Sequence, residues 1–199
     1  METKANILAI EDNIRGIIGL KYIINYITEN EHDELLEVID RQTWMETLKR
    51  RVQHYGYKYD YKKRRLDSSM YLGKLPNWIL SIARRLHEDR FLEKLPDQVI
   101  INEYMPGQGI ADHVDCPPCF DKTIISLSLG SSCIMNFTNV KTSEKIPLLL
   151  YPRSLIVLQK EARYEWKHGI APRKTDKYEG KEFIRKRRVS MTFRKIIFN

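Results

Sequence analysis

The sequence predicts a mainly β protein whose core is a double-stranded β-helix, or jelly roll, preceded by N-terminal helices. From about residue 97 onward, short apolar stretches of strand length alternate with turns, and both clear helical patterns lie earlier in the chain. A length of 199 residues suits one well-formed core. We therefore expect one domain over residues 1–199, with residues 1–96 forming a strand, helix and lid region and residues 97–199 the jelly-roll core.

The composition excludes several classes of protein. It is 42% hydrophobic and 30% charged with nine Gly and eight Pro, which is unlike a disordered or fibrous chain. No apolar run approaches the roughly 20 residues needed to cross a bilayer, so we expect no membrane association. The opening stretch METKANILAIEDN lacks the basic-then-apolar pattern of a secretory signal. We expect an intracellular protein, in cytoplasm or nucleus, and a monomer.

The net charge of +8, with a pI near 9.3, favours polyanionic partners. Nucleic acid is the leading candidate because binding it releases condensed counterions. The alternative is a lysine-rich surface that only increases solubility, and charge alone does not decide between the two.

The three cysteines, Cys116, Cys119 and Cys133, are too few for a disulfide framework and fit a reducing compartment. A structural zinc needs four ligands, and no second Cys or His pair has suitable spacing. A thioredoxin-type C-x-x-C should open a helix, which Pro117 and Pro118 disfavour. We interpret Cys116 and Cys119 as incidental loop thiols.

The first elements can be predicted from residue type and capping signals. Residues 14–27 are apolar and β-branched, which indicates a strand. Thr28 and Glu31 then form a T-x-x-E capping box that begins a helix ending near Trp44. Pro76 precedes a second helix, NWILSIARRLHED. Its apolar face carries Trp78, Ile79, Ile82 and Leu86.

Between these helices lies a stretch that alternates tyrosine with other residues. Tyr55, Tyr57, Tyr59 and Tyr61 recur with period two, which predicts a strand with one tyrosine face. A basic run follows directly and consists of Lys62, Lys63, Arg64 and Arg65. Aromatic faces beside cations suit stacked bases and phosphates, so we treat these tyrosines, Lys62 and Arg64 as candidate substrate contacts. The alternative is that about half of the tyrosines pack in the core.

The C-terminal half contains a series of short strands. They are expected at 98–105, 123–130, 132–139, 145–150, 154–159 and 188–198. Strands of this length without intervening helices indicate an antiparallel sandwich or barrel.

A candidate metal site lies within this half. His113 and Asp115 form an H-x-D motif that points both side chains to one side of an extended segment. His168 lies 53 residues after Asp115, the separation a jelly roll needs to bring it near. Two histidines and one carboxylate would form a facial triad with open positions for a 2-oxoacid and oxygen. Taken singly, His113 also fits a surface turn and His168 a buried core histidine.

The last strand supplies an R-x₅-R motif. Arg188, Ser190, Thr192 and Arg194 should share one face and point into the barrel, with Val189, Met191 and Phe193 on the other. Guanidinium groups are the natural partners of a dicarboxylate. Asn102 and Tyr104 alternate in the same way upstream and can add hydrogen bonds. Membership of the basic run 185–188 would explain Arg188 but not Arg194, which lies among apolar residues.

Together these motifs resemble the AlkB family of Fe(II)/2-oxoglutarate dioxygenases. The similar stretches are NEYMPGQGIADHVD (102–115), TIISLSLGS (123–131), YPRSLIVLQKEARYEWKHGIAPRK (151–174) and RRVSMTFRK (187–195). These stretches, and also HYGYKYDY (54–61), are most similar in sequence to the eukaryotic branch of the family that includes the tRNA wobble-uridine hydroxylase.

The resemblance implies a role for each matching residue. Iron would be bound by His113, Asp115 and His168. The 2-oxoglutarate would be contacted by Asn102, Tyr104, Arg188, Ser190 and Arg194, with Arg194 also steadying Asp115 or the 1-carboxylate. Fe(II) would be the cofactor, and 2-oxoglutarate and O2 the cosubstrates.

The resemblance also implies a reaction and a substrate class. We expect oxidation of a C–H bond on a modified or alkylated nucleobase, with RNA favoured over DNA, beneath a lid formed by the N-terminal region. The alternatives are a protein or lipid substrate, or an inactive nucleic-acid-binding relative. Arg163 and Trp166 could contact substrate, but we interpret both as structural.

Overall fold

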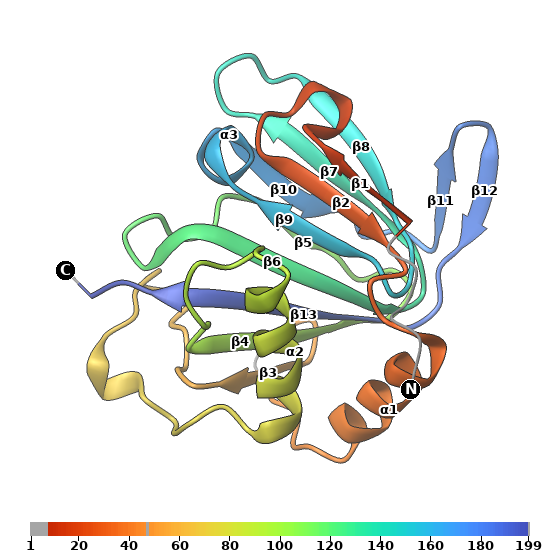
Figure 1. Cartoon of the computed structure of the whole chain (residues 1–199). Helices are drawn as coiled ribbons and strands as arrows, with labels where there is room; N and C mark the ends of the chain where they lie inside the picture. Colours follow the sequence, from red (N-terminus) through yellow and green to blue (C-terminus); the bar gives the residue numbers. More distant parts are fainter. Residues whose placement is uncertain (1–7, 47, 199) are drawn as a thin grey trace.

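The computed structural model describes residues 8–46 and 48–198 (Figure 1). Residues 1–7, part of the stretch in which a secretory signal was sought, lie outside this description. No helix in the described ranges is long and apolar enough to span a membrane.

The described chain is mostly strand, with its two longer helices near the N-terminus. The strands are β1 (Leu8–Asp12), β2 (Leu20–Ile24), β3 (Val52–Tyr55), β4 (Gln98–Tyr104), β5 (Ile110–His113), β6 (Phe120–Gly130), β7 (Cys133–Asn139), β8 (Lys145–Leu150), β9 (Leu155–Leu158), β10 (Trp166–Ile170), β11 (Thr175–Tyr178), β12 (Lys181–Ile184) and β13 (Arg188–Ile196). The helices are α1 (Glu29–Asp40), α2 (Asn77–Glu88) and α3 (Lys160–Tyr164), with 3-10 turns at Ile14–Gly16 and Ser68–Met70.

Two antiparallel sheets form the core. The larger has the order β1-β2-β9-β6-β13-β4-β3 and the smaller the order β5-β10-β7-β8. Figure 1 shows α1 and α2 against the large sheet on the side away from the small one. One apolar cluster fills the space between the helices and the large sheet, and a second involves residues of both sheets. The predicted fold class, a jelly roll with N-terminal helices, is confirmed.

The strand β13 is central and is buried on both faces. Val189, Met191 and Phe193 are fully buried in the cluster beneath the helices. Arg188, Ser190, Thr192 and Arg194 point the other way and line a cavity between the sheets. The predicted alternation is therefore confirmed, and a polar face is buried at the centre of the fold.

The two predicted helices form where their signals place them. Thr28 and Glu31 make the reciprocal capping box, with N···O distances of 3.2 and 2.8 Å. The first helix ends at Asp40, earlier than the predicted end near Trp44. In α2 the predicted apolar face packs on the core, with Ile79, Ile82 and Leu86 buried and Trp78 partly buried.

The single strand predicted over residues 14–27 is wrong. The chain makes a 3-10 turn at Ile14–Gly16 and pairs as a strand only over Leu20–Ile24. Gly16 and Gly19 both have positive φ, which L side chains rarely adopt. At Gly19 a Cβ would lie 2.2 Å from the carbonyl oxygen of Gln159, so the close approach of the Gln159 backbone requires glycine.

The predicted tyrosine strand is also wrong beyond its first residue. The strand β3 ends at Tyr55, because Gly56 has φ +77 and packs where a Cβ would be 1.8 Å from the Asp97 carbonyl oxygen. The chain then folds back on itself, with bridges from Tyr57 to Tyr71 and from Asp60 to Arg65. We call residues 57–71 the flap. Its tyrosines do not share one face.

The strands predicted in the C-terminal half did not include β5 or β10, and a helix and a hairpin there were not predicted either. The helix α3 follows β9 directly, and the hairpin of β11 and β12 projects from the body of the molecule (Figure 1). Arg185 anchors the base of this hairpin through a buried bidentate pair with Asp176, at 2.6 and 2.7 Å. Neither segment has a hydrophobic period long enough to identify it from the sequence.

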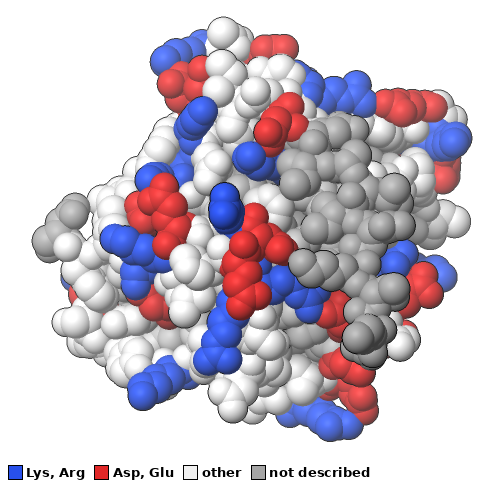
Figure 2. Space-filling model, in the orientation of Figure 1, with Lys and Arg blue, Asp and Glu red and all other residues white. Residues whose placement is uncertain are grey.

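The surface charge is mixed on the face shown in Figure 2. Basic and acidic side chains lie interspersed there. The net positive charge is therefore not gathered on this face.

The stability of the fold should depend on pH through His54. Burial, with a smaller effect of Arg194, lowers the pKa of His54 to about 4, and its Nδ1 accepts a hydrogen bond from the Tyr59 amide at 3.1 Å. Between about pH 6.5 and 4 the unfolded chain binds a proton that the folded chain excludes, so stability falls as the pH falls.

We therefore expect the unfolding free energy of wild type to fall by about 1–2 kcal/mol more than that of His54→Asn between about pH 7 and pH 5. The Oδ1 of the asparagine can accept the same hydrogen bond. Urea unfolding at the two pH values measures this difference. The exposed His87→Asn serves as control and should behave like wild type. Equal losses for wild type and His54→Asn would contradict the assignment.

Candidate active site

The two histidines of the predicted triad face each other across a strand pair. His113 on β5 is the direct partner of His168 on β10, and their ring centroids lie 4.5 Å apart. Asp115 follows two residues after His113. One ligand atom from each of the three lies within 4.8 Å of the others. The fold therefore brings together the residues that the sequence placed 53 positions apart.

Both imidazoles are prepared to donate a lone pair. The Nδ1 of His113 lies 2.8 Å from the carbonyl oxygen of Ala111 and must donate to it, which leaves Nε2 as the free acceptor. Burial lowers the pKa of His168 to about 3, so this side chain is neutral at physiological pH. Its 3.4 Å contact with Asp115 is therefore not an ion pair.

Asp115 is buried and ionised. Burial opposes ionisation, but the Arg194 guanidinium, with smaller effects of His168 and His113, holds the pKa of this carboxyl well below its usual range. Arg194 donates to Oδ1 at 2.6 Å, whereas Oδ2 has no hydrogen-bond partner. An orphaned carboxylate oxygen beside two imidazoles is the donor set of a divalent metal site. These residues therefore fit Fe(II).

Arg188 carries a buried charge with no carboxylate near it among the described residues. The side chain is 2% exposed, one amine donates to Ser128 at 3.1 Å, and Nε has no partner. Its guanidinium lies 5.4 Å from the centre of the Tyr104 ring. Burying an uncompensated charge is costly, so an anion is the expected partner of this group. A dicarboxylate cosubstrate fits this requirement.

The same cavity joins Arg188 to the triad. Its lining includes His113 and His168 at one part and Arg188 at another. The register of β4 and β13 places Tyr104 opposite Arg188, and Asn102 opposite Ser190. The predicted cosubstrate residues therefore line one cavity between the sheets, next to the metal ligands.

Arg194 is fixed on the metal side of this cavity. Besides Asp115, it contacts the Gln98 side chain at 3.3 Å and lies 4.8 Å from the centre of the Phe120 ring. Of the two roles left open by the sequence, orientation of Asp115 is the one that this geometry supports.

A cleft of about 370 Å³ opens over the triad. From the flap, Tyr59, Tyr61 and Arg64 line it together with His113 and Asp115. The rings of Tyr59 and Tyr61 lie edge-to-face at 5.2 Å.

The other candidate substrate residues lie outside the cleft lining. Tyr55 packs against Trp78 of α2, and Tyr57 against Tyr71 and Phe198. Lys62 is exposed and does not line the cleft. Half of the tyrosine stripe thus faces the cleft and half is packing material, which is the split that the alternative interpretation allowed.

Two residues of the site were not predicted from the sequence. Arg50 lines the cleft, donates to Asn102 at 3.0 Å, and lies near the ring faces of Tyr61 and Tyr104. The basic triplet at 49–51, just before the tyrosine stretch, was the available signal. Ser128, the partner of Arg188, lies within the quoted SLSLGS motif but was given no role.

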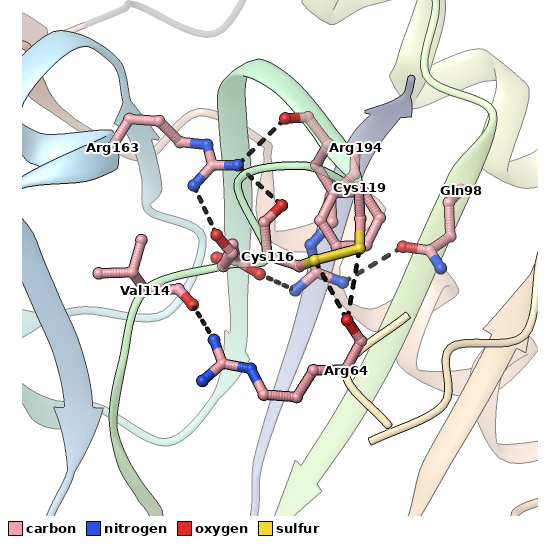
Figure 3. Close-up of a disulfide and its surroundings, with 9 residues drawn as sticks. Arg64, Gln98, Val114, Cys116, Cys119, Arg163 and Arg194 are labelled. Carbon is pink, nitrogen blue, oxygen red and sulfur yellow. Dashed lines mark hydrogen bonds and ion pairs between the residues drawn. A yellow bond between two sulfur atoms is a disulfide. The ribbon is translucent and has the colours of Figure 1, made fainter. Parts of the chain in front are cut away.

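Arg163 and Trp166 are both buried, as the structural interpretation requires. Arg163 donates to the carbonyl oxygens of Asp115, Cys116, Phe120 and Asp121 at 2.8–3.4 Å (Figure 3). It therefore holds the loop that follows the H-x-D motif.

The interpretation of Cys116 and Cys119 as loop thiols is wrong. They form a disulfide in this loop (Figure 3). Cys133 is free and buried. A turn places them side by side, with the amides of Cys119 and Phe120 donating to the Cys116 carbonyl. Sequence spacing alone could not reveal that this turn forms.

A jelly roll that holds two histidines and an aspartate beside a buried arginine defines a non-haem iron, 2-oxoacid-dependent oxygenase. The chain belongs to the 2OG-Fe(II) oxygenase superfamily, whose model matches residues 19–194, and within it to the AlkB dioxygenases. It is an enzyme with Fe(II) as cofactor and 2-oxoglutarate and O2 as cosubstrates.

Three similar proteins illustrate this placement. An uncharacterised protein, L905, of Acanthamoeba polyphaga mimivirus is 36% identical over 92% of this chain and 87% of its own length. The mouse tRNA (carboxymethyluridine(34)-5-O)-methyltransferase ALKBH8 is 38% identical over 82% of this chain, but the match spans only 26% of the mouse protein. The solved structure of OsALKBH1 shares the fold, with a TM-score of 0.67 and 15% identity over 89% of this chain and 96% of that one.

Removal of one imidazole should abolish metal binding. We expect His168→Ala to bind Mn(II), a spectroscopic substitute for Fe(II), at least about 100-fold more weakly than wild type, because loss even of an indirect partner of a ligand costs 10- to 100-fold. Titration followed by electron paramagnetic resonance measures the affinity. The exposed His87→Ala should bind like wild type, and undiminished binding by His168→Ala would exclude it as a ligand.

Replacement of Arg188 should change stability and ligand binding in opposite directions. We expect Arg188→Met to abolish 2-oxoglutarate binding in calorimetry yet to stabilise the ligand-free protein by about 1–4 kcal/mol, because it removes an uncompensated buried charge. The matched control is Arg185→Met, which breaks the buried pair with Asp176 and should destabilise by about 3–5 kcal/mol. Retained 2-oxoglutarate affinity in Arg188→Met would refute the assignment.

Proposed function

We propose that this enzyme oxidises a C–H bond on a modified or alkylated nucleobase of RNA, by hydroxylation or by oxidative N-demethylation. The observation that carries the proposal is the cleft over the triad. It combines the aromatic rings of Tyr59 and Tyr61 with the guanidinium groups of Arg50 and Arg64. Rings that can stack on a base, beside cations that can contact phosphate, are the recognition elements of single-stranded nucleic acid.

We propose the following roles for the residues of the site. His113, Asp115 and His168 bind Fe(II), which together with its cosubstrates supplies the oxidation of an otherwise unreactive C–H bond. Arg188 pairs with the far carboxylate of 2-oxoglutarate, assisted by Asn102, Tyr104 and Ser190, and Arg194 orients Asp115. The charge-assisted bond from Arg188 selects a dicarboxylate over a monocarboxylate.

The flap would then hold the substrate. An enzyme that oxidises a base must first take it out of its stack and bring the target carbon near the metal. Tyr59 and Tyr61 lie where such a base would enter, and Arg64 contacts the metal-ligand loop through the carbonyl oxygen of Val114 at 3.3 Å. The exposed Lys62 and Lys63, next to Arg64, would contact the phosphate backbone of the nucleic-acid strand that carries this base.

The similarity to the mouse protein supports RNA over DNA. The name of that protein states a tRNA substrate, although methyl transfer is a different reaction from 2-oxoglutarate-dependent oxidation. The chain matches about a quarter of it, so the tRNA substrate is proposed here and the methyl transfer is not. We also propose that residues 1–199 act as one catalytic domain.

The test is mass spectrometry of nucleosides from total tRNA, and from methylated RNA and DNA oligonucleotides, after incubation with enzyme, Fe(II) and 2-oxoglutarate. We expect a new hydroxylated or demethylated nucleoside from RNA, with succinate formed in at least equal amount. The Arg188→Met variant should form neither. RNA that stays unchanged, while succinate formation responds to a protein or lipid extract, would overturn the proposal in favour of those substrates.

The flap cations should contribute to RNA binding. We expect Lys62→Ser with Lys63→Ser to weaken RNA binding and lower the slope of log affinity against log salt by about 1–2, while 2-oxoglutarate turnover without substrate persists. Fluorescence anisotropy over a salt series measures the slope. The control is Arg84→Ser with Lys94→Ser, which removes two exposed cations away from the cleft lining. An equal loss of slope in both pairs would show that the effect is only one of net charge.

A further inference from the structure

The loop that follows the H-x-D motif connects the metal site to the flap through sulfur. The disulfide of Cys116 and Cys119 begins one residue after Asp115, and Cys116 lines the cleft. Both sulfur atoms face the same group on the flap, the carbonyl oxygen of Arg64. The distances are 3.4 Å from Cys116 and 3.8 Å from Cys119 (Figure 3).

These contacts differ chemically between the two oxidation states. A thiol carries an S–H that can donate to a carbonyl oxygen, although weakly, whereas a disulfide sulfur has no hydrogen to donate. The distances are within reach of an S–H···O bond. Reduction would therefore give the Arg64 carbonyl two donors, and oxidation would remove both.

The loop is held in place without the disulfide. The amides of Cys119 and Phe120 donate to the Cys116 carbonyl at 3.1 and 3.2 Å, which forms the turn. Arg163 binds the carbonyl oxygens at both ends of the loop, and the amide of Ile197 donates to the Cys119 carbonyl at 3.1 Å. Because the backbone is fixed by other groups, it can remain in place while the sulfur–sulfur bond forms or breaks.

The oxidation state of the cysteines would affect the flap through one residue, Arg64. Arg64 adopts φ +48, an unfavourable conformation for a residue with a side chain, and its guanidinium donates to the Val114 carbonyl at 3.3 Å. Its carbonyl contacts the sulfurs and its side chain contacts the loop, so Arg64 links the flap to the metal-ligand loop at two points. One of these points depends on the oxidation state of the cysteines.

We propose that Cys116 and Cys119 form a reversible dithiol–disulfide site that sets how firmly the flap is held against the metal-ligand loop. A small-molecule thiol, entering through the cleft, would reduce the disulfide by exchange, and a small-molecule disulfide would oxidise the dithiol by the reverse exchange. Two reductant thiols give up two electrons and two protons and become one disulfide, and the S–S bond becomes two S–H groups. The dithiol holds the flap closed over the cleft, and the disulfide loosens it.

The test is hydrogen exchange of the flap amides in the Mn(II)-loaded protein, without nucleic acid, in dithiothreitol or in oxidised glutathione. The reporters are the amides of Asp60, Lys62 and Lys63, which are bonded within the flap. We expect exchange to be about two- to fivefold slower in the dithiol state, the effect of one weak hydrogen bond. Intact mass and alkylation establish the oxidation state of each sample.

Variants of Cys116 and Cys119 distinguish the effect of hydrogen-bond donation to the Arg64 carbonyl from the effect of the covalent S–S bond. Cys116→Ser with Cys119→Ser keeps two donors and should show slow exchange under both conditions. Cys116→Ala with Cys119→Ala keeps none and should show fast exchange under both. Cys133→Ala, which changes the buried free cysteine, should respond like wild type. The proposal is overturned if wild-type flap exchange is the same in both oxidation states, if the alanine pair exchanges as slowly as the dithiol, or if the two cysteines cannot be interconverted. Because no nucleic acid is present, the result is independent of the proposed substrate.

Discussion

The burial of charge on one face of β13 is the constraint around which the site is built. A central strand of a two-layered fold has no solvent on either side, so its alternate residues normally pack as apolar groups. Here one face does so beneath the helices, while the other places Arg188 and Arg194 between the sheets. A buried cation needs an anion or several hydrogen-bond acceptors to offset its lost hydration. Arg194 has Asp115, whereas Arg188 has one hydroxyl partner, Ser128, and no salt bridge among the described residues. The site therefore has one charge balanced internally and one left for a ligand.

The three proposed metal ligands are positioned by separate parts of the fold. The antiparallel pairing of β5 with β10 fixes the two histidines opposite each other. Asp115 lies beyond that ladder and is held by Arg194 through its side chain and by Arg163 through its carbonyl oxygen. The rigid part of the site thus consists of a strand pair and two buried arginines.

The flap has a different character from this rigid part. It is irregular, its bonds are mostly local, and its tyrosines divide between the cleft and the packing beneath it. Its Arg64 contacts the metal-ligand loop and lies beside the disulfide. A rigid oxidation site under an adjustable cover allows substrate recognition to change without disturbing the metal.

Local patterns in the sequence were sufficient for the fold class, the capped helix α1 and the alternation of β13. These features depend on period, capping chemistry and strand length, which are properties of neighbouring residues. The H-x-D and R-x₅-R motifs likewise identified the metal and cosubstrate candidates. The family resemblance added their roles and the reaction.

The tertiary structure decided the features that depend on contacts between distant segments. The approach of Asp97 to Gly56 and of Gln159 to Gly19 turned two predicted strands into bends, because no side chain fits at those glycines. Arg50 joined the site through Asn102, 52 positions away. The disulfide depends on a turn that Arg163 holds from 40 positions or more along the chain. Sequence periodicity describes how a segment presents its side chains, but which groups meet is fixed only when the sheets and loops are packed together.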